Sequence, residues 1–157
     1  MPRMDWLVLL HVLVAFAFVA GLVGRDITIA QARRSHDLTS ITELLAVANR
    51  FDTIVKIGSI AVLVFVLLAM VVSDLSVSDN GWLVASLALY VALGLLVPIV
   101  FLPRGRVFDA ALADARQRGE VTPALTEAFR DSAVTFARNA ELIIVAVIIG
   151  LMVLKPF

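Results

Sequence analysis

His11 is the residue whose type and position most suggest chemistry in this sequence. It is the only histidine inside a long apolar run, Trp6 to Gly24. A haem b or metal site in a helical bundle usually takes its imidazole ligands from facing helices. The other histidine, His36, lies near a polar turn at the opposite end of the expected helix, so the two imidazoles cannot share one ligand. A haem at His11 would need Met ligation or a second copy of the chain. The alternative is a structural histidine that is hydrogen-bonded within the bundle, with Ser86 as the first partner to consider.

Four charged residues lie at the edges of two other apolar runs, namely Asp52, Lys56, Arg138 and Glu141. Charges at such depth in a membrane are costly, and they tend to pair or to line a pathway. Lys56 and Glu141 fall within about one helical turn of the same depth, and Asp52 precedes Lys56 by four residues on one helix. We therefore predict an ionic cluster with a Lys56–Glu141 pair at its core, extended by Asp52 and Arg138. Independent snorkelling of these side chains to the lipid headgroups is the alternative.

The sequence lacks the motifs of other common catalytic, metal-binding and nucleic-acid-binding sites. There is no cysteine, which excludes disulfides, thiol catalysis and Cys-ligated metal centres. A glycine-rich phosphate loop, a Ser-x-x-Lys motif, paired carboxylates inside an apolar run and a His-rich tract are all missing. Thirteen basic residues balance thirteen acidic ones, whereas a nucleic-acid-binding protein needs a basic surplus. We expect no catalytic residue, no metal site, no bound cofactor and no nucleic-acid partner.

The composition indicates the elements that must position these residues. Of the 157 residues, 61% are apolar and only 17% are charged, which is typical of a membrane protein. A helix needs about 20 apolar residues to cross roughly 30 Å of hydrocarbon. The expected spans are residues 6–24, 53–72, 82–102 and 135–154. The second reaches this length only with Lys56 included, and the fourth, whose uncharged run begins at Leu142, only if its helix begins near Thr135. We predict an all-α integral membrane protein, a single domain of residues 1–157 built as a four-transmembrane-helix bundle. Trp6 and Trp82 stand at span ends, where indole rings anchor at the membrane interface.

The polar segments between the spans carry helix signals of their own. Ser40-Ile-Thr-Glu43 has the capping-box pattern, and Thr122-Pro123 places a cap before an N1 proline. Gly119 is a natural helix stop. No Gly or Pro interrupts the chain between Ile41 and Gly58, or between Pro123 and Gly150. We therefore predict helical extensions over residues 25–52 and 103–138. The second and fourth helices should run unbroken, which makes two long hairpins that extend into the cytoplasm.

The distribution of basic residues predicts the orientation. Ten Lys or Arg residues lie between spans one and two or between spans three and four, against two, Arg3 and Lys155, on the other side. Basic residues of short loops stay in the cytoplasm, so both termini are expected outside the bacterial inner membrane. Gly21 and Gly24 form a small-residue pattern that favours close helix contact.

Four short stretches carry a resemblance that covers nearly the whole chain. They are Trp6-Leu-Val-Leu-Leu-His11-Val-Leu, Arg50-Phe-Asp52, Arg116-Gln-Arg-Gly119 and Leu151-Met-Val-Leu-Lys155-Pro156. Together they resemble a bacterial family of small predicted integral membrane proteins that is filed as a domain of unknown function. That resemblance implies the four-helix fold and no particular reaction. The histidine in the first span is also similar to that of copper-resistance and protoporphyrinogen-oxidase-like membrane domains. Those domains use more than one intramembrane histidine, which this chain lacks.

Two classes of function remain open. The first is a non-catalytic membrane subunit or scaffold that meets membrane lipids and a partner membrane protein, or a second copy of the chain. The second is a haem-binding or redox membrane protein that uses His11. A visible absorption spectrum of the purified protein distinguishes the two.

The predicted orientation can be tested with single cysteines, since the chain has none of its own. A membrane-impermeant thiol reagent should label Ser78→Cys in cells with intact inner membranes, and should label Ser35→Cys only after the membrane is opened. Labelling of Ser35→Cys from outside would contradict the orientation.

Overall fold

The described residues of the computed structural model, 2–73 and 80–156, are helical apart from short turns and breaks. The elements are α1 (Pro2–Arg34), α2 (Leu38–Ser73), α3 (Gly81–Leu96), the π-helical turn η1 (Val97–Phe101), α4 (Leu102–Arg118), α5 (Pro123–Phe129) and α6 (Ser132–Leu154). Four helical stretches are long and apolar enough to cross a membrane: Trp6–Arg34, Leu38–Val72, Gly81–Arg118 and Pro123–Leu154. The expected all-α fold with four transmembrane helices is confirmed. Ser78 and most of the predicted turn around it lie outside the described residues.

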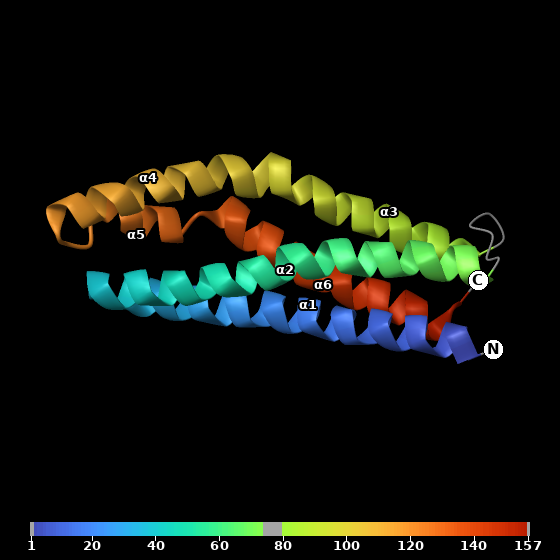
Figure 1. Cartoon of the computed structure of the whole chain (residues 1–157). Coiled ribbons are helices and arrows are strands. Elements are labelled where there is room, and N and C mark those ends of the chain that lie inside the picture. Colours follow the sequence, from blue (N-terminus) through green and yellow to red (C-terminus); the bar gives the residue numbers. More distant parts are fainter. Residues whose placement is uncertain (1, 74–79, 157) are drawn as a thin grey trace.

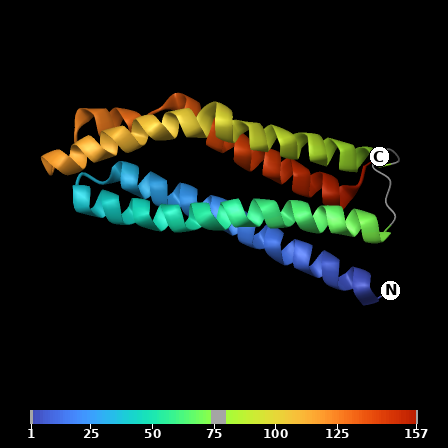
Figure 2. The ribbon, with the colours of Figure 1, turned by 45° about the horizontal axis from the view of Figure 1, so that its top comes forward.

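The helices form two antiparallel hairpins that lie side by side (Figure 1). The first hairpin pairs α1 with α2, and the second pairs α3, η1 and α4 with α5 and α6. Both chain termini lie at one end of the bundle, which we call the terminal end, and the α1–α2 and α4–α5 turns lie at the other, which we call the turn end (Figures 1 and 2). Contacts within each hairpin are extensive, whereas α1 meets α6 over only a short stretch. Each hairpin therefore packs mainly within itself.

The first hairpin is built from two unbroken helices of 33 and 36 residues. At 1.5 Å per residue each is about 50 Å long, well beyond the roughly 30 Å of hydrocarbon. α2 is continuous, as expected, but it begins at Leu38 rather than at Ile41. The Asp37 carboxylate accepts hydrogen bonds from the Ser40 backbone N–H (2.8 Å) and hydroxyl (2.7 Å), so the predicted cap Ser40 lies inside the first turn. These bonds hold the pKa of Asp37 below its usual value.

The second hairpin is irregular in both of its arms, and here the expectation of an unbroken fourth helix is wrong. α5 ends at Phe129, and α6 begins anew at Ser132. The Asp131 carboxylate caps α6 by accepting from the Ala133 (2.9 Å) and Val134 (3.2 Å) backbone N–H groups. A search for Gly and Pro alone cannot find a break made by an aspartate cap.

The opposite arm contains Pro98 in the π-helical turn η1. A proline lacks the N–H group of an ordinary residue and its ring crowds the preceding turn, so the local hydrogen-bond register shifts. At the far end of this arm Gly119 ends α4 with a φ of 71°, and the Thr122 hydroxyl caps α5 by accepting from Leu125 N–H (3.3 Å). Both of these end signals agree with the sequence prediction.

Two glycines of α1 allow α2 to approach closely. A Cβ added at Gly24 would lie 2.6 Å from the Phe51 ring, and one at Gly21 would lie 3.1 Å from a Val55 methyl group. Beside this contact Leu22 and Val55 form the membrane core together with Val145 from α6. The small residues thus let the α1–α2 helices pack tightly, as membrane helices without a hydrophobic driving force must.

Gly24→Leu should separate α1 from α2 and lower the melting temperature in detergent, because overpacking of this kind costs about 1–3 kcal/mol. Gly150→Leu is the matched control, since a Cβ at Gly150 would meet nothing within 4 Å. Equal melting temperatures for the two variants would show that the Gly24 contact does not hold the hairpin together.

Candidate functional site

A buried arginine joins the two hairpins. The Arg25 side chain of α1 is only 10% exposed, and its guanidinium forms a salt bridge with Glu141 of α6, which is 12% exposed. The same guanidinium lies 3.2 Å from an Asp26 oxygen and 3.6 Å from an Asp52 oxygen of α2. The planar fork of an arginine can serve several carboxylates at once. Arg25 therefore connects three helices through one side chain.

Two further cations complete this group, which we call the Arg25 cluster: Arg25, Asp26, Asp52, Lys56, Arg138 and Glu141. Arg138 Nη1 lies 3.5 Å from Asp26 Oδ1, and Lys56 Nζ lies 2.7 Å from Asp52 Oδ2. The three cations balance the three carboxylates. Such balance is what allows ionised groups to remain at the edge of an apolar bundle.

The structure brings the predicted residues together but pairs them differently. The salt bridge of Glu141 is formed with Arg25, and Lys56 contacts Asp52 at the periphery of the cluster. The Lys56 side chain is 73% exposed, so it extends away from the bundle in the manner of a snorkelling lysine. The sequence prediction of the cluster does not include Arg25, which it counts only among the basic residues that indicate the orientation in the membrane. The available signal was its position directly after the first apolar run, next to Asp26.

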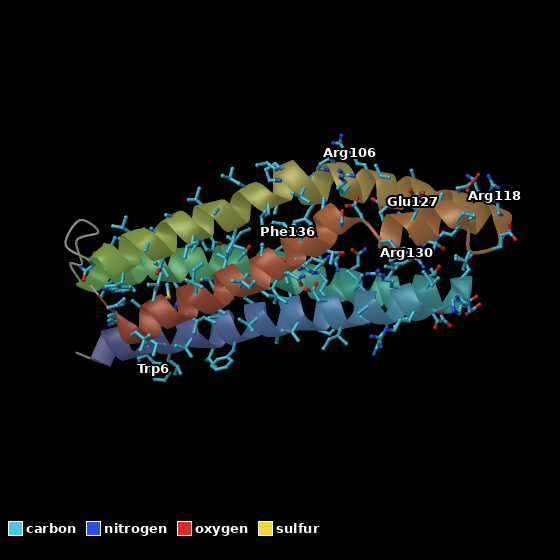
Figure 3. The ribbon with its side chains drawn as sticks, turned by 180° about the vertical axis from the view of Figure 1, so that it is seen from behind. Trp6, Arg106, Arg118, Glu127, Arg130 and Phe136 are labelled. Atoms are coloured by element: carbon cyan, nitrogen blue, oxygen red, sulfur yellow. The ribbon has the colours of Figure 1, made fainter. Side chains whose placement is uncertain are left out.

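A large cleft opens between the hairpins from the Arg25 cluster toward the turn end, with a volume of about 1200 Å³. Its walls there carry apolar side chains from both hairpins, with Ile29 from the first and Val107 from the second. Toward the turn end Leu45 of α2 and Phe108 of α4 pack against the buried cluster that contains Leu112. Basic residues also line it, namely Arg33, Arg34, Arg104 and Arg116. Arg104 is bridged to Asp131 at 3.1 Å, while the other three form no salt bridge with any described residue. Figure 3 shows further charged side chains, including Arg118 and Arg130, toward the same end.

His11 lies in a separate, small cavity of about 70 Å³ in the terminal half of the bundle. All four spans line this cavity, with Val62 from α2, Ser86 and Tyr90 from α3 and Met152 from α6. The imidazole faces the Val62 backbone carbonyl, and its Nδ1 is buried without a hydrogen-bond partner. The Ser86 hydroxyl donates instead to the Trp82 carbonyl at 2.8 Å. The expected direct bond between His11 and Ser86 is therefore not found among the described contacts.

The two predicted interface anchors lie at the terminal end. Trp6 is 67% exposed, and the Lys155 ammonium sits 5.4 Å from the centroid of the Trp82 ring. Figure 3 shows Trp6 far from the charged turn end. An indole in this position, with an apolar body and a polar N–H, suits the headgroup region.

Among the described residues, no group of three or more His, Asp or Glu side chains is placed to hold a metal ion. The site-forming features of this part of the chain are thus the Arg25 cluster, the cleft below it and the His11 cavity.

These features define the class of protein: a four-helix integral membrane protein whose two hairpins are joined by ionised side chains. The chain belongs to the family described as predicted integral membrane protein (DUF2269), whose model matches residues 5–156. No curated protein and no solved structure matched in the same comparisons.

The Arg25–Glu141 pair should show strong coupling in thermal melts. Arg25→Met and Glu141→Gln should each destabilise the protein by about 3 kcal/mol, since each leaves a buried charge uncompensated. The double variant should lose clearly less than the sum of the two. Lys56→Met is the control and should have a small effect, because this side chain is 73% exposed and contacts only the periphery of the cluster. Additive losses for Arg25 and Glu141 would contradict a joint role.

Proposed function

We propose that the protein is a non-catalytic membrane subunit that binds a partner protein in the cleft between its hairpins. It lies in the bacterial inner membrane with both termini outside, so that the cleft opens to the cytoplasm. The ratio of ten basic residues to two supports this orientation. The hairpins then act as two arms, and the Arg25 cluster holds them together at the inner membrane boundary.

The observation that carries this proposal is the combination of apolar walls with unpaired arginines in an open cleft. Ile29 and Val107 line it from opposite sides, and Val107 is 61% exposed. Apolar walls favour an apolar occupant because burial removes them from water. Arg33, Arg34 and Arg116 favour one that also carries acidic groups.

An acidic amphipathic helix of a partner meets both requirements. A helix is about 10 Å across and rises 5.4 Å per turn, so about 1200 Å³ holds about three turns. Its apolar face would pack against the walls, in the helix-in-groove mode of recognition, while its carboxylates meet the three arginines.

Photocrosslinking in cells tests this proposal. A photoreactive residue at Val107, inside the cleft, should form an adduct with one partner, and sequencing of the crosslinked peptide should identify an acidic amphipathic helix. The control is Ile27, which has similar exposure (54%) but does not line the cleft. The charge-reversed variant Arg33→Glu/Arg34→Glu/Arg116→Glu should lose the Val107 adduct at least tenfold while the protein remains folded and inserted.

Several outcomes would contradict the proposal. An adduct of the same intensity from Ile27 would mean that the cleft is not the binding surface. If Val107 forms adducts with lipid alone, or with a second copy of the chain, the occupant of the cleft is not a partner helix. If the charge-reversed variant still forms the Val107 adduct, the three arginines do not contribute to binding of the partner.

A haem-binding or redox protein that uses His11 is the second candidate, favoured by the unpartnered Nδ1 and by Met152 in the same cavity. The cavity of about 70 Å³ is well below the roughly 300 Å³ at which ligand pockets begin, so the four spans as arranged do not fit a porphyrin. A second copy of the chain would have to complete such a site.

A further inference from the structure

The His11 cavity and the cleft are separated by a single layer of side chains. Phe18, Tyr90 and Leu93 line both spaces. On the turn-end side of this layer the cleft contains Ser59 and the Arg25 cluster. On the other side the small cavity contains Ser86 and His11. Among the described residues that line both spaces, the one with a polar side chain is Tyr90.

Tyr90, in this layer, and His11, beside it, both face backbone carbonyl groups of α2. The Tyr90 hydroxyl of α3 donates to the Ser59 carbonyl at 2.6 Å, and the His11 imidazole of α1 faces the Val62 carbonyl. These carbonyls are three residues apart, about 4.5 Å along the helix. Polar groups thus follow one another along α2 through the apolar part of the bundle.

The small cavity can hold water between these groups. A water needs about 10–15 Å³ of such space and two to four polar partners, and about 70 Å³ accommodates several. His11 Nδ1, the Ser86 hydroxyl and the Tyr90 hydroxyl provide the partners. A buried Nδ1 without a hydrogen bond is costly, which favours water at this position.

The polar groups extend over about half of the membrane thickness, and a short further distance separates them from the terminal surface. Asp52 and Val62 are about 15 Å apart along α2, and His11 lies about 8 Å from the level of Trp6 along α1, out of roughly 30 Å of hydrocarbon. Ionisable residues in such a position commonly mark proton pathways. The cavity is small and its walls are mostly apolar, which favours a few waters over a hydrated metal ion.

We propose that the protein conducts protons across the membrane along the path from His11 through Tyr90 to the carboxylates at the head of the cleft. A water inside the cavity, in exchange with the terminal side, gives a proton to the buried His11 Nδ1, which forms an imidazolium whose other N–H faces the Val62 carbonyl. The proton leaves Nδ1 along the cavity water and reaches the Tyr90 oxygen. As that proton arrives, Tyr90 passes its own hydroxyl proton to water in the cleft, where Asp52 or Glu141 receives it, and the new O–H turns back to the Ser59 carbonyl. This activity goes beyond partner binding and requires only the chain itself.

Proton flux into liposomes tests this proposal. The purified protein is reconstituted with a pH-sensitive dye inside, and a potassium gradient with valinomycin drives protons across the membrane. The wild type should change the internal pH at least tenfold faster than protein-free liposomes. Tyr90→Phe, which removes one oxygen, and His11→Phe should return the rate to that background.

Two controls keep the test specific. Met152→Leu changes an apolar wall of the same cavity and should leave the flux unchanged. His11→Gln retains a polar side chain that cannot relay a proton in the same way, and it should be inactive even if His11→Phe fails to fold. Thermal melts identify the variants that are folded.

A wild-type flux equal to that of protein-free liposomes would overturn the proposal. It would also fail if both His11 variants kept the full rate, or if sodium ions crossed as fast as protons. The partner is absent from this experiment, so its result is independent of the crosslinking test of the cleft.

Discussion

The contact between Arg25 and Glu141 is the interaction on which the arrangement of the two hairpins depends. Each hairpin packs tightly within itself, and α1 and α6 meet only along a short stretch. At that stretch Leu22, Val55 and Val145 provide apolar contact, and the Arg25 cluster adds charge pairing among α1, α2 and α6. A buried charge cannot be left without its partner, so the ionic contact sets the depth at which the hairpins meet. Below it the cleft begins, and near the turn end the hairpins meet again, where Leu38 and Leu45 of α2 pack against the buried cluster of Leu112, Ala115 and Leu125.

The two hairpins differ in regularity, which shapes the cleft further. α1 and α2 run straight through the membrane and beyond it. The second hairpin contains the η1 turn in one arm and the Asp131 cap in the other, and the Arg104–Asp131 salt bridge at 3.1 Å links the beginning of α4 to this cap. The irregular positions of both arms are thus adjacent, and the α4–α5 part of the hairpin can take a direction of its own. The edge-on contact of the Phe108 and Phe129 rings, 4.9 Å between centroids, then holds α4 and α5 together.

Much of the fold could be predicted from residue type and order. Gly119 and Thr122 were recognisable as helix ends, because backbone conformation and capping are local properties. The break before α6 was missed, since an aspartate inside a helical stretch caps a new helix only when the chain turns there. The prediction of a Lys56–Glu141 pair is wrong for a different reason. Depth along the chain can be counted from the sequence, but the rotation of each helix about its axis cannot.

The sequence by itself therefore determined that four apolar helices cross a membrane and that the charges gather at one level of it. An apolar run of this length leaves the chain no other way to bury its side chains and satisfy its backbone. Only the tertiary structure decided that Arg25 rather than Lys56 faces Glu141, that His11 Nδ1 is left without a partner, and that Tyr90 separates two cavities. These facts depend on which face each helix turns toward its neighbours. That choice is made by close contacts such as Gly24 against Phe51, between residues far apart in the chain.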